Sequence, residues 1–472
     1  MKRRTIEVNI SSFSKKGNGL ALWNIPQVGE SLVEIPFTMP GDLVQAEVER
    51  KRSGVYQGKL QAILTPSPDR IKPLCAHFAV CGGCKLQHLT YEHQLQYKEE
   101  LIRSSFGPLI TSKVVFRPII PSVPWQYRNK MEYSFSSDAS GKKFLGLIME
   151  GGQGKVLNLS ECHLTHPWFI DALLTVRQWW HESDLSSYNM HNNTGSLRTL
   201  TVREGQKTRD RMIILTVSGN PEYALHKGHI ESFIAFLRNA VEPSDPACHF
   251  SIFLRIQQTQ KGMPTQMYEM LLHGQDHIRE FLHIQVGSKT DVLSFGISPS
   301  AFFQPNTLQA EKIYSHALEL AEPSPETIVY DLYCGTGALG ICLSKHVKQV
   351  FGIELSPESS LDARQNALKN GCENVTIFTG DVQKVLAREK LPVPDIVLID
   401  PPRAGLDSGA IKQIVEMKPA KIVYVSCNPA TQADNIKEML KCGYDLKVIQ
   451  PIDQFPQTNH VENIALLHRT FS

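Results

Sequence analysis

The feature that most constrains the fold is a regular alternation of strand-like and helix-like segments from about residue 291 onward. Short apolar runs typical of buried strands are separated by amphipathic stretches, of which 358–370, ended by Gly371, is the clearest helix. This alternation predicts an α/β fold with a largely parallel sheet covered on both faces, and such sheets bind ligands at the carboxyl ends of their strands. The expected strands are 327–333, 349–353, 375–378, 395–399 and 421–425.

The length of the chain predicts more than one domain. Its 472 residues exceed the roughly 250–300 residues at which a single core stops growing. We expect a small β-barrel over 1–65, a central α+β domain over 66–290 and a Rossmann-like domain over 291–472. The strands expected in the barrel are 5–10, 31–37, 43–50 and 59–64, and in the centre we expect helices at 91–103 and 166–182 and strands at 197–203 and 211–217.

Charge is distributed unevenly along the chain. Residues 1–130 hold 18 basic and 10 acidic side chains, a balance of +8, whereas the remainder has a balance of −6. A polyanion such as RNA would therefore meet the N-terminal part first. The start, Met1 to Arg4, is basic like a secretion signal, but 5–10 alternates like a strand, and no segment has the ~20 consecutive apolar residues of a membrane span. We expect a cytoplasmic monomer.

A glycine-rich turn marks the cofactor site. Residues 331–340 follow a strand and open a helix with the spacing G-x-G-x-x-G, and Glu354, at the end of the next strand, is placed to accept hydrogen bonds from two ribose hydroxyls. The glycines alone fit a nicotinamide dinucleotide as well as S-adenosylmethionine. Asp400, in Asp-Pro-Pro-Arg after the fourth strand, favours S-adenosylmethionine. Asp381 is placed to meet the adenine, although an Asp after a strand is often only a helix cap.

Two further residues indicate covalent chemistry. Cys427, in Ser-Cys-Asn-Pro, lies where the fifth strand gives way to a helix, beside donors that favour a thiolate. The alternative is a buried cysteine that serves as a small apolar residue. Glu462, just before the last apolar strand, is the candidate base. The pair suits methylation of uracil at carbon 5, in which a thiolate adds at carbon 6 and a base later removes the carbon-5 proton.

A cysteine cluster lies in the expected central domain. Cys75, Cys81 and Cys84, with the distant Cys162, offer four thiolates, which could hold Zn²⁺ or a [4Fe–4S] cluster. Zinc favours two closely spaced cysteine pairs, and only one is present, so the spacing favours iron and sulfur. The alternative is a set of cysteines without a metal.

Several motifs together resemble the RNA uracil-5-methyltransferase family. They are Ser-Ala-Phe-Phe-Gln-Pro-Asn at 300–306, the glycine turn at 331–337, Asp-Pro-Pro-Arg at 400–403, Ser-Cys-Asn-Pro at 426–429 and His-Val-Glu at 460–462. The resemblance implies that Gln304, Tyr333, Glu354 and Asp400 bind S-adenosylmethionine, that Cys427 is the nucleophile and that Glu462 is the proton acceptor. Ala338 stands where many members have Asn.

One branch of that family is similar over more of the chain. The first 64 residues resemble the TRAM domain, an RNA-binding barrel of the branch that modifies large-subunit ribosomal RNA. Members of this branch carry a [4Fe–4S] cluster on cysteines that match Cys75, Cys81, Cys84 and Cys162. The resemblance therefore implies methylation of a uridine in 23S rRNA.

Three alternatives remain open from the sequence. A tRNA uridine, or two ribosomal sites, would need the same chemistry. A nicotinamide-dependent iron–sulfur oxidoreductase would explain the glycine turn, Glu354 and the four cysteines, but not Cys427, Asp400 or Glu462. A catalytically inert RNA-binding assembly factor would leave Cys427 and Glu462 without a role.

Overall fold

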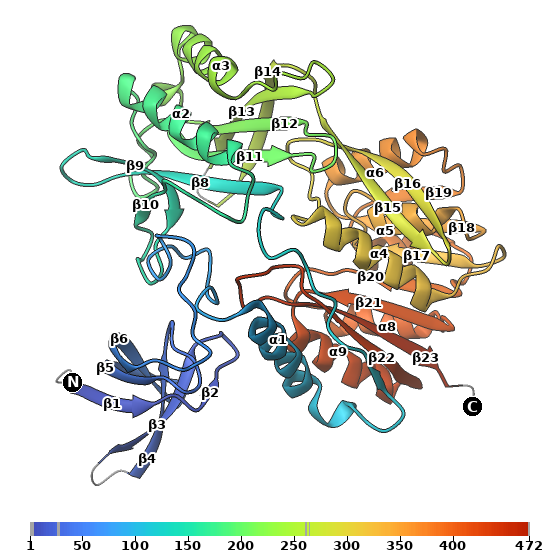
Figure 1. Ribbon diagram of the computed structural model, residues 1–472. Helices are drawn as coiled ribbons and strands as arrows, with labels where there is room; N and C mark the ends of the chain where they lie inside the picture. Colours follow the sequence, from blue (N-terminus) through green and yellow to red (C-terminus); the bar gives the residue numbers. More distant parts are fainter. Residues whose placement is uncertain (1–3, 26–28, 260–261, 264, 471–472) are drawn as a thin grey trace.

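The computed structural model describes residues 4–25, 29–259, 262–263 and 265–470, and Figure 1 shows their arrangement. Met1 to Arg3 of the basic start and the last two residues of the expected C-terminal domain lie outside the described residues. An N-terminal β-rich part, a central part with its own sheet, and a C-terminal part follow one another along the chain. Among the described residues, no helix is long and apolar enough to cross a membrane.

The N-terminal part is one six-stranded sheet with the strand order β1-β5-β6-β4-β3-β2. Its buried face forms a small core of aliphatic side chains, among them Val33, Ile35 and Val44. All four expected strands are present as β1, β4, β5 and β6, whereas β2 and β3 were not expected, because Gly19 and the apolar run at 20–22 break the polar–apolar alternation. The strands are β1 (Arg4–Asn9), β2 (Ser12–Phe13), β3 (Gly19–Ile25), β4 (Gly29–Ile35), β5 (Leu43–Arg52) and β6 (Val55–Thr65).

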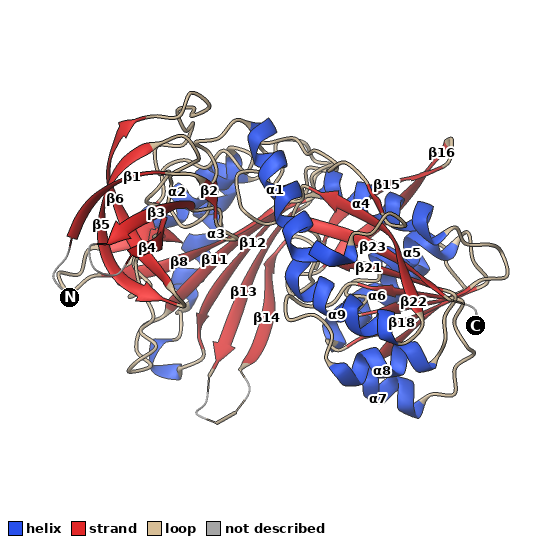
Figure 2. Cartoon of the chain, turned by 90° about the horizontal axis from the view of Figure 1, so that it is seen from below, coloured by secondary structure: helices blue, strands red, loops and turns tan. Residues whose placement is uncertain are grey.

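The central part is a seven-stranded sheet with the order β10-β9-β8-β11-β12-β13-β14, and Figure 2 shows β14 at its edge. Two helices, α2 (Trp168–Glu182) and α3 (Lys227–Val241), cover one face through a core that includes Trp179, Trp180 and Phe233. The strands are β8 (Lys130–Ser137), β9 (Lys143–Ile148), β10 (Val156–Asn158), β11 (Leu197–Glu204), β12 (Arg211–Ser218), β13 (Phe250–Gln258) and β14 (Gln266–His273), with a short 3-10 helix at Pro221–Tyr223.

The C-terminal part is an eight-stranded sheet with the order β19-β18-β17-β20-β21-β23-β22-β7. The strands β17 to β21 run parallel, and β23 lies antiparallel between β21 and β22. The five strands expected here are present. The strands are β7 (Val115–Phe116), β17 (Ile328–Leu332), β18 (Gln349–Glu354), β19 (Val375–Thr379), β20 (Ile396–Ile399), β21 (Lys421–Ser426), β22 (Tyr444–Ile452) and β23 (Glu462–Arg469), and a separate hairpin is formed by β15 (Ile278–Val286) and β16 (Lys289–Ile297).

Helices cover both faces of this sheet, as the alternation predicts. Side chains of α4, α5 and α6 share one core with the strands, and those of α1, α7, α8 and α9 share the other. The helix α1, at residues 91–106, and the strand β7, at 115–116, lie within the expected central domain but pack on the C-terminal part; Figure 1 shows α1 beside α9. The helices are α1 (Tyr91–Phe106), α4 (Thr307–Ala321), α5 (Ala338–Ser344), α6 (Pro357–Lys369), α7 (Val382–Arg388), α8 (Ser408–Glu416) and α9 (Pro429–Lys441), with a 3-10 turn at Gly107–Leu109.

Candidate active site

The glycine turn follows β17 and lies beside the end of β18. Gly335 and Gly337 have φ angles of +55° and +77°, a conformation that favours glycine. Glu354 accepts hydrogen bonds from the backbone N–H groups of Gly335, at 3.0 Å, and Ser356, at 2.8 Å. A Cβ atom added at Gly335 would meet no atom within 4 Å, so the turn borders open space. A ligand could occupy the open space beside this turn and donate hydrogen bonds from its hydroxyl groups to the Glu354 carboxylate.

The third glycine of the motif allows a close approach between α5 and β17. The N–H of Gly340 donates to Asp331 Oδ2 at 2.8 Å, and a Cβ at position 340 would lie 2.8 Å from that oxygen. Burial raises the pKa of Asp331 to about 7, although the Gly340 hydrogen bond opposes the shift. Tyr333, in the same turn, has a φ of +65°, and burial raises its pKa to about 12.

Asp400 follows β20 at the same edge of the sheet. Burial raises its pKa to about 7, so its carboxyl group exchanges a proton near neutral pH. The charge of Asp400 in turn raises the pKa values of Asp331, Glu462 and Cys427, which places all four groups in one electrostatic environment.

Cys427 lies in the loop between β21 and α9, as the sequence indicates. Ser426 Oγ accepts from the N–H of Asn428 at 3.1 Å, and the Asn428 side chain donates to the carbonyl of Arg403 at 3.0 Å, so the loop is held on both sides. The expectation that the helix start favours a thiolate is wrong for the free protein. Burial and the nearby Glu462 carboxylate raise the pKa of Cys427 to about 11, and Arg403 only partly opposes the shift.

Glu462 is the first residue of β23, and the strand register brings it next to Cys427. Ser426, the last residue of β21, pairs with Asn463 of β23. Cys427, one residue beyond β21, and Glu462 are therefore at the same end of this strand pair, and the Glu462 charge raises the pKa of Cys427. Glu462 is only 4% exposed, unlike an ordinary glutamate at a strand start. Burial and the Asp400 charge raise its pKa to about 8, which makes the carboxylate a stronger base than usual.

Gln304 and Asp381, the other predicted cofactor residues, have different surroundings. Gln304 is buried just before α4, where its side-chain Oε1 accepts from Gln454 Nε2 at 3.0 Å. Asp381 is the N-cap of α7 and accepts from the N–H of Lys384 at 3.1 Å. The sequence did not single out Gln454, because no local pattern distinguishes a buried glutamine as part of a site. It named Arg403 only as the last residue of the Asp-Pro-Pro-Arg motif, without a role.

The four predicted cysteines share one cavity. A cavity of about 330 Å³ is lined by Cys75, Cys81, Cys84 and Cys162 on one side and by Arg403, Phe455, Thr458 and His460 on the other. Burial raises the pKa values of all four thiols, to about 11 for Cys75 and about 12 for Cys84. Four thiols that line one cavity offer the donor set of an iron–sulfur cluster, which would stabilise the thiolates that burial disfavours. Within the described part of the chain, no three of these thiols lie close enough together to share a single metal ion.

A second possible ligand set overlaps the first. Within the described part of the chain, the ligand atoms of Cys75, His77 and Glu161 lie within 4.8 Å of one another. Cys75 Sγ is 3.9 Å from His77 Nδ1. Sequence reasoning passed over His77 and Glu161, although each lies within two residues of a predicted cysteine ligand.

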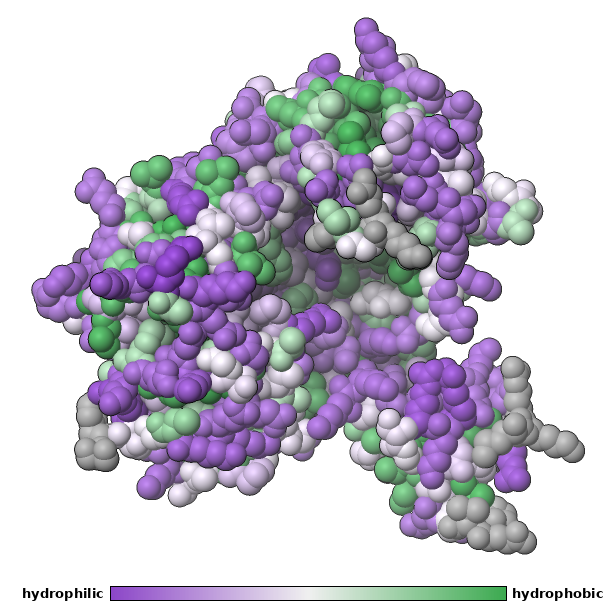
Figure 3. Space-filling view, turned by 180° about the vertical axis from the view of Figure 1, so that it is seen from behind, coloured by the Kyte–Doolittle hydropathy of each residue, from purple (hydrophilic) through white to green (hydrophobic). Residues whose placement is uncertain are grey.

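Seen from behind, the molecule is hollowed at its centre, where its parts meet (Figure 3). The cavity between the cysteines and Arg403 joins residues of the central and C-terminal parts. Arg403, which lines this cavity, also lowers the pKa of Cys427, so the predicted nucleophile lies near one wall of the cavity.

Comparisons with known proteins agree with this geometry. Residues 265–470 match the family model described as tRNA (Uracil-5-)-methyltransferase. An uncharacterized RNA methyltransferase of Protochlamydia amoebophila is 53% identical over 439 residues, which cover 92% of this chain and 99% of the relative. A second, from Chlamydia trachomatis, is 40% identical over 84% of this chain and 98% of the relative.

A solved structure matches nearly the whole chain. The tRNA (uracil-54, C5)-methyltransferase of Pyrococcus abyssi, in complex with S-adenosyl-L-homocysteine, has a TM-score of 0.71 and 25% identity, and the match covers 98% of this chain and 100% of that one. The Rossmann-like fold is thus that of an S-adenosylmethionine-dependent methyltransferase. The chain belongs to the RNA uracil-5-methyltransferase family.

Proposed function

We propose that the chain transfers a methyl group from S-adenosylmethionine to carbon 5 of a uridine in RNA through a covalent adduct with Cys427. The observation that carries the proposal is the register of β21 and β23, which pairs Ser426 with Asn463 and so sets Cys427 beside Glu462. Asp400 lies in the same electrostatic environment. An oxidoreductase or an inert assembly factor has no use for a half-buried cysteine near a buried carboxylate.

The protein residues would act in a fixed order. The Cys427 thiol gives its proton to water, and the resulting thiolate forms a bond to carbon 6 of the uracil, whose carbon 5–carbon 6 π electrons move toward the carbon-4 oxygen as an enolate. When bound, S-adenosylmethionine supplies the electrophilic methyl group that carbon 5 of this enolate attacks. Glu462 then accepts the carbon-5 proton, the electrons of that C–H bond re-form the carbon 5–carbon 6 double bond, and the sulfur leaves carbon 6 as a thiolate.

The residues proposed to hold S-adenosylmethionine surround the glycine turn. Glu354 would accept hydrogen bonds from the ribose, and Tyr333, Gln304 and Asp400 would contact the rest of the molecule. The open space beside Gly335 and the Glu354 carboxylate support this assignment. Asp381 would meet the adenine in addition to capping α7.

For the target, we propose a uridine of 23S rRNA. In this proposal 1–65 is a TRAM-like RNA-binding barrel, 66–290 a central RNA-binding domain and 291–472 the methyltransferase domain. The surplus of eight positive charges over residues 1–130 supports contact with RNA at that end. A [4Fe–4S] cluster on the four cysteines is part of the same proposal, and their shared cavity supports it.

A tRNA uridine is the second candidate target, and the likeness of nearly the whole chain to the Pyrococcus tRNA enzyme favours it. Mass mapping of 5-methyluridine in ribosomal and transfer RNA, from cells with and without the gene, separates the two. Our proposal predicts that one 5-methyluridine disappears from 23S rRNA. Its loss from tRNA would move the target to the second candidate, and no loss from either RNA would contradict both.

A further inference from the structure

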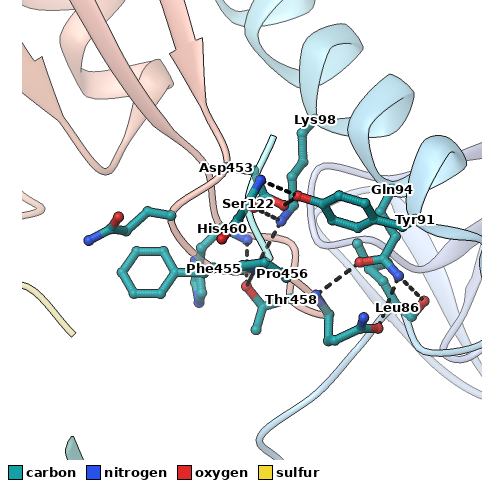
Figure 4. Close-up of polar contacts among 12 residues, drawn as sticks. Leu86, Tyr91, Gln94, Lys98, Ser122, Asp453, Phe455, Pro456, Thr458 and His460 are labelled. Carbon is teal, nitrogen blue, oxygen red and sulfur yellow. Dashed lines mark hydrogen bonds and ion pairs between the residues drawn. The ribbon is translucent and has the colours of Figure 1, made fainter. Parts of the chain in front are cut away.

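The loop that leads to Glu462 is anchored from α1, far away in the sequence. We call residues 453–461, between β22 and β23, the base loop. Lys98 of α1 and Asp453 of the base loop have side chains with 0% exposure, and Lys98 Nζ donates to Asp453 Oδ1 at 2.6 Å and to the carbonyl of Phe455 at 2.9 Å (Figure 4). Tyr91 OH donates to the other Asp453 oxygen at 2.8 Å. Asp453 is therefore fixed on both oxygens.

The rest of the base loop is held in the same way. Gln94 donates to Gln457 Oε1 at 3.0 Å and accepts from the Gln457 N–H at 2.9 Å. The Tyr127 hydroxyl donates to the carbonyl of Pro456 at 3.0 Å. A buried charge pair with satisfied hydrogen bonds tolerates little displacement, so this loop has one strongly preferred position.

Gln454, between these anchors, points away from them to the predicted cofactor site. Its side chain is buried, its Nε2 donates to Gln304 Oε1 at 3.0 Å, and its carbonyl accepts from Asn306 Nδ2 at 3.2 Å. Among the described residues, no acceptor is hydrogen-bonded to Gln304 Nε2. Because an amide is planar, fixing its oxygen also fixes the direction of its NH₂ group.

We infer that Gln454 is a positioning residue that turns the Gln304 amide so that its NH₂ group faces the ligand. The inference rests on the proposed function, in which Gln304 contacts S-adenosylmethionine. The outward group is a donor, so it requires an acceptor, and the carboxylate of the amino-acid end of the cofactor is the strongest acceptor that the cofactor offers. The anchored base loop thereby fixes both the position of the Glu462 carboxylate and the orientation of the Gln304 amide.

A double-mutant cycle on ligand binding tests this role. S-adenosylhomocysteine is titrated calorimetrically into the full-length wild type, Gln454→Leu, Gln304→Ala and the double variant. Loss of one oriented hydrogen bond predicts about fivefold to tenfold weaker binding for Gln454→Leu. The double variant should bind no more weakly than Gln304→Ala alone, because Gln454 acts only through Gln304.

Two controls separate this role from a general disturbance. Gln450→Leu removes an equally buried glutamine, which donates to the carbonyls of Pro118 and Pro451, and should leave binding unchanged. 5′-Methylthioadenosine lacks the amino-acid end, so Gln454→Leu should bind it as the wild type does. If Gln454→Leu does not fold, the same titrations are made with Gln454→Met.

The outcomes distinguish this inference from the proposed function. Three results would overturn the positioning role. Gln454→Leu could bind S-adenosylhomocysteine as tightly as the wild type, or the double variant could lose affinity by the product of the two single losses. Gln454→Leu could also weaken the binding of 5′-methylthioadenosine as much as that of S-adenosylhomocysteine. A wild-type protein that binds S-adenosylhomocysteine with the expected coupling but methylates no uridine in ribosomal or transfer RNA would instead overturn the proposed function alone.

Discussion

Replacing Glu462 by glutamine should make the protein more stable than the wild type at alkaline pH. Glu462 is 4% exposed, and its pKa rises from 4.5 to about 8 in the folded protein. One pKa unit corresponds to about 1.4 kcal/mol, so the whole shift corresponds to roughly 4–5 kcal/mol. Because part of the pKa shift comes from the Asp400 charge, we expect Glu462 alone to lower the free energy of unfolding by about 2–4 kcal/mol at alkaline pH.

The sign follows from proton binding. The folded protein keeps the Glu462 proton up to a higher pH than the unfolded chain does, so wild-type stability falls relative to Glu462→Gln as the pH rises from 4.5 to about 8. Above that range the difference should stay constant. Urea unfolding of both proteins between pH 5 and 9, followed by far-ultraviolet circular dichroism, measures the difference.

A matched substitution on an exposed residue provides the control. Glu438→Gln, on the solvent side of α9, should give a stability difference from the wild type that does not change with pH. A pH-independent difference for Glu462→Gln as well would refute the reasoning, because it would mean that the carboxyl group is not perturbed by burial.

Three further outcomes follow from other parts of the structure. Lys98→Met should lower the free energy of unfolding in urea by about 3–5 kcal/mol, because it leaves Asp453 buried without its partner. The double variant Lys98→Met/Asp453→Leu should recover most of this loss, and equal instability of the two variants would contradict the role of the buried charge. Cys427 should react with iodoacetamide slowly at pH 8 and faster as the pH rises toward 11, and a reaction at pH 8 as fast as that of a small free thiol would show that its pKa is not raised. The proposed [4Fe–4S] cluster predicts that protein purified without oxygen contains iron and absorbs visible light, and that Cys84→Ser lowers both; unchanged iron would exclude this ligand.

Most site residues that could be predicted from the sequence were found because they follow the ends of predicted strands. The alternation after residue 291 placed β17, β18, β20 and β21 correctly, and in a parallel sheet their carboxyl ends meet at one edge. Glu354 and Cys427 were located by this rule alone. The position of Glu462 beside Cys427 required the additional fact that β23 lies antiparallel to β21, which the sequence does not encode locally.

Long-range contacts account for what the sequence did not reveal. Lys98 and Asp453 are 355 residues apart, and Gln304 and Gln454 are 150 apart, so no local pattern links them. The error on the Cys427 thiol has the same origin. A helix start predicted a lowered pKa, but burial and the carboxylates of Glu462 and Asp400, brought in by tertiary folding, outweigh it.

The most direct test of the account is whether Cys427 becomes attached to a uracil ring. Full-length protein is incubated with S-adenosylmethionine and 23S rRNA or tRNA transcripts that contain 5-fluorouridine, which has no carbon-5 proton for Glu462 to remove. The account predicts a complex that survives denaturation, with the nucleotide mass on the peptide that holds Cys427 and none with Cys427→Ala. Methyl transfer to ordinary uridine by Cys427→Ala, or attachment at another residue, would contradict it.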